Sequence, residues 1–230
     1  MDVLKGTLIT LCIGLCCFYP FNFSLGQSVS VEGRVEGTVL LAPKENPVRV
    51  GGRYGRPTRS DASSEPSTNH ALIWLESSSV SNSGNPEDPV ILDQKDLTFE
   101  PSILAVRQHG EVRIVNSDPV YHNVFSLSPP KRFDVGRRPK GEYLDVSFDK
   151  PGVVDVFCDI HSNMRATIYV MTPNVLTWMK VKSGESFSFE NIDPGYYQLK
   201  VYALGYQENT VSIEVTEGEA TDIGTLTLNF

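Results

Sequence analysis

The chain has 230 residues, a formal net charge of -8 and a sequence pI near 5.0. Such an acidic chain repels the phosphate backbone of nucleic acids, which argues against nucleic-acid binding as its role. Hydrophobic residues make up 40% of the sequence and aromatic residues 10%. The β-branched and aromatic residues stand in short runs separated by Gly, Pro and Asn, a pattern that predicts an all-β protein of one or two domains.

Residues 1–26 have the pattern of a signal peptide. Lys5 precedes an apolar run from Gly6 to Phe18, and Ser24-Leu25-Gly26 offers small residues at the two positions that a signal peptidase reads. Cleavage before Gln27 predicts an exported protein, periplasmic or secreted. The alternative is a retained membrane anchor, because the segment is nearly long enough to span a bilayer. An uncleaved signal segment is the only membrane association that the sequence indicates.

The remaining elements are predicted from alternating apolar residues and turn signals. In residues 28–89 we expect strands and polar stretches at Val29–Leu41 (strand), Arg49–Asn69 (loop), Ala71–Leu75 (strand) and Ser77–Pro89 (flexible linker). From residue 90 to 171 we expect β segments at Leu97–Ile103, Val112–Ile114, Tyr121–Leu127, Val146–Phe148, Val153–Cys158 and Arg165–Met171, with Lys131–Gly141 as a polar loop. Residues 172–230 read as a second β unit, with strands at Ser186–Phe189, Tyr197–Val201, Val211–Val215 and Leu226–Leu228.

One cysteine remains after the predicted cleavage site, because the other three lie in the signal segment. Exported proteins use cysteine mainly in disulfide pairs, so a lone cysteine is either buried and inert or a metal thiolate. Cys158 begins the pattern Cys158-x2-His161-x2-Met164 directly after a predicted strand, and His122 lies on another strand. Two histidines, one cysteine and a long axial methionine form a blue-copper site. We therefore expect one type 1 copper ion bound by these four residues.

Each of these residues alone has an ordinary explanation. A single buried cysteine is usually a small apolar residue, and a single methionine usually fills a core. The combination in this order favours copper, while zinc is the main competitor for a Cys-His set but rarely takes a thioether ligand. His70 and His109 lie in predicted loops, and we expect both to be solvated rather than to bind metal.

Several short motifs carry a resemblance to a known family: Phe99-Glu-Pro101, Asn116-Ser-Asp-Pro119, His122-Asn-Val-Phe-Ser126, Arg132-Phe-Asp-Val-Gly136, Phe148-Asp-Lys-Pro-Gly152 and Phe157-Cys-Asp-Ile-His-Ser-Asn-Met164. The segment from about Leu97 to Val170 closely resembles the plastocyanin/amicyanin-like cupredoxins, especially the methylamine-utilisation-type proteins. The resemblance implies a cupredoxin Greek-key β-sandwich at residues 90–171. It also implies that Asn123 braces the ligand loop by hydrogen bonds and that electrons enter at the edge of His161. Ser162 departs from the family, where Pro often follows the histidine, and this predicts a less rigid loop.

The end of the chain resembles a second family. The stretch from Phe187 to Val201, followed by Gly205-Tyr206, is similar to carboxypeptidase-regulatory-like, transthyretin-type β-sandwich modules. In these modules a G-x-V strand and an A-x-V-x-L strand come first, and here the matching strands lie upstream of residue 90. One interpretation is a copper domain inserted into a smaller, discontinuous sandwich made of residues 28–89 and 172–230. The other is a tail domain at 172–230 with unrelated N-terminal strands.

Three functions fit these predictions. The first is single-electron transfer between redox partners; the second is copper transport or tolerance; the third is a non-redox surface or scaffold role for the second sandwich. A copper enzyme is disfavoured, because a four-ligand site leaves no open position for substrate. The basic cluster within Lys131–Lys140 is either a solvated loop or a docking surface for an acidic redox partner.

Overall fold

The computed structural model describes residues 32–43, 69–79 and 88–230. The predicted signal peptide at residues 1–26 lies outside the described residues, as do residues 49–68 of the predicted loop and 80–87 of the predicted linker. Within the described ranges the structure contains sixteen strands and no helix, which confirms the all-β prediction. In those same ranges, therefore, no helix is long and apolar enough to cross a membrane.

The central sandwich consists of two sheets formed by the strands between residues 90 and 171. One sheet has the order β4-β3-β6-β9, with β3 at Val90–Lys95, β4 at Thr98–Glu100, β6 at Gly110–Asn116 and β9 at Tyr143–Phe148. The other has the order β5-β11-β10-β7-β8, with β5 at Ile103–Arg107, β7 at His122–Ser126, β8 at Phe133–Arg138, β10 at Gly152–Cys158 and β11 at Arg165–Met171. Buried residues alternate with less buried ones along β6 and along the second half of β10, so each strand places one face in the core. That core includes Leu92, Phe148 and Val156.

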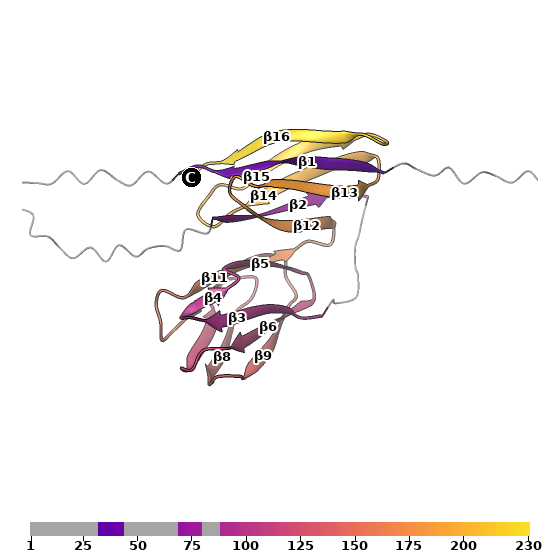
Figure 1. The fold of residues 1–230 in the computed structure, drawn as a ribbon. Coiled ribbons are helices and arrows are strands. Elements are labelled where there is room, and N and C mark those ends of the chain that lie inside the picture. The colour runs from indigo at the N-terminus through magenta and orange to yellow at the C-terminus, as the bar shows by residue number, and fades with distance from the viewer. Residues whose placement is uncertain (1–31, 44–68, 80–87) are drawn as a thin grey trace, which may run out of the picture. The chain divides into compact units, whose positions relative to one another are not determined.

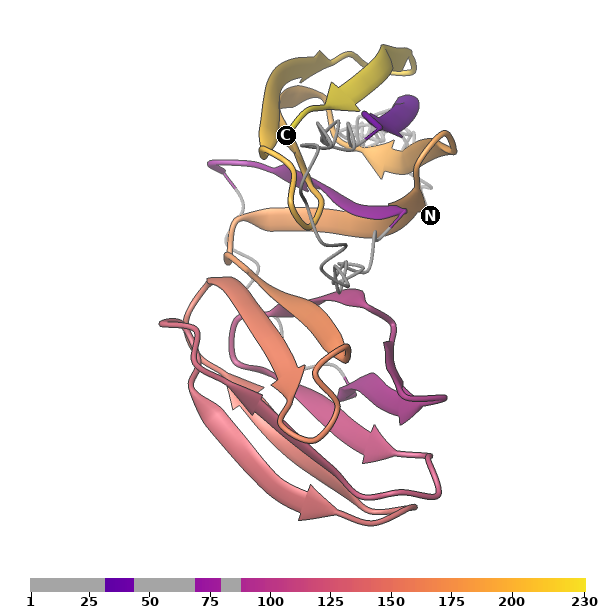
Figure 2. The same cartoon turned by 90° about the vertical axis from the view of Figure 1, so that its left-hand side faces the viewer.

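A second sandwich, here called the split sandwich, takes strands from both ends of the chain (Figure 1). Its first sheet has the order β13-β1-β16, with β1 at Gly33–Leu41, β13 at Ser186–Ile192 and β16 at Ala220–Leu228. Its second has the order β12-β2-β14-β15, with β2 at His70–Glu76, β12 at Val175–Lys182, β14 at Gly195–Tyr202 and β15 at Asn209–Val215. The strand β1 pairs in parallel with β16 and antiparallel with β13. Figure 2 shows β2 and β12 side by side, where the chain leaves the split sandwich and returns to it.

Apolar side chains pack between the two sheets of the split sandwich and hold them together. Val35, Val39 and Leu75 have no exposed surface and share a core with Leu199. Gly37 lies at a crowded point of this sandwich, because a Cβ atom there would be 2.9 Å from the Gly224 carbonyl oxygen. Strand β1 carries the G-x-V motif, at Gly33–Val35 or Gly37–Val39, and β2 carries the motif similar to A-x-V-x-L at Ala71–Leu75. These two strands supply inward-facing residues to sheets whose other strands all lie after residue 174.

Three stretches differ from the sequence-based expectations, and the first is strand β3 at Val90–Lys95, which was not predicted. The predicted polar loop at 131–141 contains strand β8, so that prediction was wrong over Phe133–Arg138. A register shift between Asn123 and Phe125 and a positive φ of 70° at Gly136 break the alternation that would have indicated a strand. Strand β12 was not predicted, because the four residues from Leu176 to Met179 are all half-buried and give no alternating pattern.

Candidate metal centre

The candidate site lies where β7 and β10 run side by side in the central sandwich. Phe157 pairs with Phe125, and Cys158 pairs with Val124. Because residues two apart on a strand face the same side, His122 lies on the face that Val124 and Cys158 share. Val154 and Val156 are fully buried and fix which face of β10 points inward, so the Cys158 thiol enters the core side of the sheet.

Three donor atoms meet at this point. The Cys158 Sγ is 3.6 Å from the His122 Nδ1 and 3.9 Å from the His161 Nδ1, and the two Nδ1 atoms are 3.1 Å apart. The thiol and His122 are buried, and His161 is half-buried. Among the residues that the structure describes, these three form the one His/Cys/Asp/Glu group with metal-binding spacing. His70 and His109 are not part of it.

Met164, the fourth predicted ligand, lies at the end of the loop that follows Cys158. The Met164 N–H donates to the His161 carbonyl, and the Cys158 N–H donates to the Met164 carbonyl at 3.3 Å. These bonds close the loop between the two residues. The Met164 side chain is 1% exposed and belongs to the same apolar cluster as Cys158 and Val124. It therefore lies on the buried side of the loop that carries His161.

A buried carboxylate that the sequence analysis missed orients His122. The Asp118 Oδ2 lies 2.9 Å from the His122 Nε2, and both side chains are almost fully buried. An ionised carboxylate can only accept, so the Nε2 carries the proton and the Nδ1 keeps its lone pair on the side of Cys158. This is the arrangement in which a histidine binds metal through one nitrogen and is held through the other.

Asp118 itself is held in its ionised form. Burial alone would raise the pKa of this carboxyl, but hydrogen bonds from the Leu97 N–H, from His122 and from the Asp96 N–H hold the pKa below its usual value. The two backbone bonds measure 3.0 Å and 2.7 Å. Asp118 lies four residues before His122 in the Asn116-Ser-Asp-Pro119 motif, where the sequence by itself indicates only a turn.

Asn123, predicted from the family resemblance to brace the ligand loop, links β7 to that loop in two ways. Its carbonyl accepts from the Asp159 N–H at 3.3 Å, and its side-chain Nδ2 donates to the Asp159 Oδ2 at 3.2 Å. Asp159 follows Cys158 directly. The two contacts therefore tie the start of the ligand loop to the strand that carries His122.

The two segments that border the site expose apolar side chains. Val120 and Tyr121 immediately precede His122, and Ile160 immediately precedes His161; all three are 40% exposed or more.

Comparisons with known proteins give partial matches. A family described as polysaccharide lyase family 4, domain II, matches residues 163–223, which is well under half of the chain. No curated protein matches. Among solved structures, a Cu-containing nitrite reductase from Thermus scotoductus SA-01 is 25% identical with a TM-score of 0.37, over 39% of this chain and 24% of that one. A reduced mutant of amicyanin is 19% identical with a TM-score of 0.35, over 43% of this chain and 98% of that one. At these TM-scores the likenesses do not establish a family.

Proposed function

We propose that this protein binds one copper ion as a type 1 centre and carries single electrons. The observation that carries the proposal is the convergence of His122 Nδ1, Cys158 Sγ and His161 Nδ1, all within 4.8 Å of one another. Met164 is proposed as the axial fourth ligand. A His2Cys set with a weak thioether is the donor set of blue-copper electron-transfer sites.

The spacing of the donor atoms supports this assignment. Nitrogen and sulfur ligands bind a metal of this kind at about 2.0–2.3 Å, so two ligands of one ion lie roughly 3–4 Å apart. The three separations of 3.1, 3.6 and 3.9 Å fall within that range. The hydrogen bond from His122 Nε2 to Asp118 leaves the opposite nitrogen available for the ion. The residues therefore fit copper.

When bound, the copper would supply a one-electron couple. The protein's part is to keep the ligand positions constant in both oxidation states. Asp118 holds the ring of His122, and Asn123 and Asp159 tie β7 to the ligand loop. The burial of Cys158 and His122 excludes water from one side of the site, while the half-buried edge of His161 stays accessible to a partner.

The proposal includes an exported, periplasmic or secreted protein that is not an enzyme. Its motivation is the signal-like pattern of residues 1–26 and a site whose four proposed ligands would leave no position for substrate. Intact-mass measurement of protein from the cell envelope tests the first point. A mass that includes residues 1–26 would contradict cleavage.

The optical spectrum of the oxidised, copper-loaded protein tests the site. Wild type should show the intense visible charge-transfer band of a copper thiolate. Cys158→Ser should abolish that band and His122→Ala should weaken or remove it, whereas the matched control His109→Ala should leave it intact. A Cys158→Ser protein that keeps the colour would refute the ligand assignment.

Met164 separates an electron carrier from a copper transport or tolerance protein. In a blue-copper site the axial ligand tunes the redox potential more than it holds the metal. Met164→Leu should therefore retain copper and colour and shift the potential measured by voltammetry. If the Met164→Leu protein instead releases copper to a mild chelator and the wild type exchanges electrons slowly, copper transport is the better description.

A further inference from the structure

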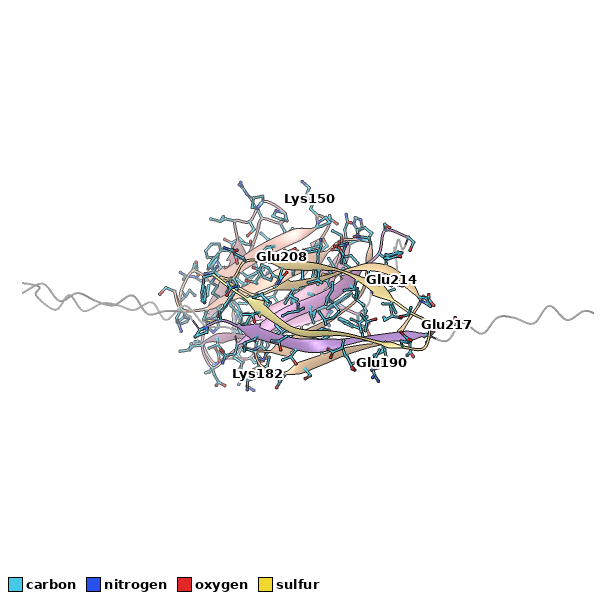
Figure 3. The ribbon with its side chains drawn as sticks, turned by 90° about the horizontal axis from the view of Figure 1, so that it is seen from above. Lys150, Lys182, Glu190, Glu208, Glu214 and Glu217 are labelled. Carbon is cyan, nitrogen blue, oxygen red and sulfur yellow. The ribbon has the colours of Figure 1, made fainter. Side chains whose placement is uncertain are left out.

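Strand β8 and its flanks concentrate positive charge in an acidic protein. Residues 131–140 contain five basic residues and one acidic residue, whereas residues 172–230 contain eight acidic and three basic residues. Figure 3 shows Glu190, Glu214 and Glu217 of the split sandwich with their side chains projecting from the ribbon. The basic segment therefore has a net positive charge, whereas the whole protein has a net negative charge.

The basic segment lies beside the ligand strand. In the register of β7 and β8, Arg138 pairs with His122 and Arg137 pairs with Asn123. Paired residues on antiparallel strands have Cα atoms about 4.5–5.5 Å apart. This Cα–Cα separation is shorter than the Debye length of about 10 Å at 0.1 M salt. The positive charges of Arg137 and Arg138 therefore attract an acidic partner to the surface beside the ligand residues.

The charges on this strand are available to a partner. Arg132, Arg137 and Lys140 are exposed. In the described ranges Arg132 and Arg137 form no ion pair, and Arg138 has one weak pair with Glu142 at 3.5 Å. The strand is also the edge of its sheet, so within the described ranges no further strand covers its outer side. Charged residues on an edge strand usually prevent sheet-to-sheet association, which explains their presence but not the excess of five basic residues over one acidic residue.

We propose that β8 and its flanks, residues 131–140, form the docking surface for an acidic electron-transfer protein. The proposal rests on the proposed electron-carrier function and adds to it where the partner binds and what charge it has. The partner's acidic surface pairs with Arg132, Arg137 and Lys140, and the exposed apolar residues Val120 and Ile160 lie on the neighbouring ligand segments. With copper bound, the site would accept one electron from the reduced partner, so the partner would be oxidised by one electron and Cu(II) would become Cu(I).

A matched pair of charge reversals tests the surface. Arg137→Glu changes the charge beside the ligand strand, and Lys182→Glu makes the same change at the end of β12, in the split sandwich. The seven residue steps from Val175, where β12 begins, to Lys182 span about 23 Å at 3.3 Å per residue, well beyond the Debye length. Arg137 and Lys182 are both exposed, and Figure 3 labels Lys182, so neither substitution disturbs a core.

Stopped-flow kinetics at low salt give the first readout, with reduced plant-type ferredoxin as the acidic probe and a basic c-type cytochrome as the opposite probe. Steering by charge changes association rates by 10-fold or more. Arg137→Glu should slow the ferredoxin reaction about 10-fold, speed the cytochrome reaction, and converge with wild type at 1 M salt. Lys182→Glu should change either rate less than about twofold. Equal effects of the two variants would overturn the assignment of the surface.

The second readout needs no copper. Hexacyanochromate(III), a redox-inert paramagnetic anion, should broaden the NMR amide signals of residues 131–140 in the metal-free protein, and Arg137→Glu should remove the effect. Broadening elsewhere would overturn the proposal, as would concentration-dependent self-association through β8, which would identify a second copy as the occupant. A missing copper band would instead refute the metal site, so the two failures are distinguishable.

Discussion

Asp118 is predicted to stabilise the metal-free fold. Its carboxylate accepts from the Asp96 N–H, the Leu97 N–H and the His122 Nε2 at 2.7, 3.0 and 2.9 Å. Asp96 and Leu97 have φ values of 53° and 58°, in the left-handed region that costs non-glycine residues of order 1–3 kcal/mol each. The carboxylate therefore holds a turn that is locally unfavourable.

The expected loss follows from the number of donors left without an acceptor. A hydrogen bond to a charged group contributes about 1.5–3 kcal/mol, and an unpaired buried donor costs about 1–3 kcal/mol. Asp118→Asn keeps one acceptor oxygen and turns an amide N–H towards one of the donors, so it should cost about 2–3 kcal/mol. Asp118→Ala leaves all three donors without the carboxylate and should cost about 4–5 kcal/mol.

Urea unfolding of the metal-free protein measures this loss as a shift of the midpoint at constant slope. Asp134→Asn is the matched control, because Asp134 accepts one hydrogen bond from the Gly136 N–H at an exposed position that Asn also supports. It should change the free energy of unfolding by less than about 0.5 kcal/mol. An Asp118→Ala protein within about 1 kcal/mol of wild type would show that the carboxylate network does not have the role inferred here.

Three further predictions concern the rest of the fold. Gly37→Ala should cost about 1–3 kcal/mol, because the new Cβ would be 2.9 Å from the Gly224 oxygen; thermal unfolding measures it. Phe148→Ala, at a fully buried position, should cost about 3–5 kcal/mol in urea unfolding, and the exposed control Ile91→Ala far less. Burial raises the pKa of Tyr202 to about 12, so its contribution to stability is complete below the unfolded pKa near 10 and is lost as pH rises through about 12. Phenolate absorbance follows this titration, and Tyr202→Phe should flatten the alkaline decline in stability.

Most of the strands, and the loop from Cys158 to Met164, could be predicted from the sequence because their signals are local. Alternating valines mark β10 up to Cys158, and the short spacing from Cys158 to Met164 confines three proposed ligands to one loop. The approach of His122 to that loop depends on the pairing of Cys158 with Val124, which no local pattern indicates. The prediction included His122 because two histidines, a cysteine and a methionine together match a blue-copper donor set.

The features that were missed depend on context rather than on local pattern. Strand β8 alternates poorly because of the bulge at Gly136, and its register with β7 places charge beside the site. Asp118 reads in sequence as an ordinary turn residue next to Pro119. Its role follows from burial and from the approach of the β3–β4 turn, which the sequence alone does not place.

The interrupted path of the chain through the split sandwich has a consequence for folding. Glu76 at the end of β2 pairs with Val175 at the start of β12. The central sandwich is therefore an insertion between two neighbouring strands of the split sandwich, and its two ends lie side by side. Closing an unstructured loop of roughly 100 residues costs about 4 kcal/mol of chain entropy. A folded central sandwich brings its own ends together and removes most of that cost. Because β16 completes the sheet of β1 and follows the central sandwich in sequence, the split sandwich can form only after the central sandwich has been synthesised, and we expect the central sandwich to fold first.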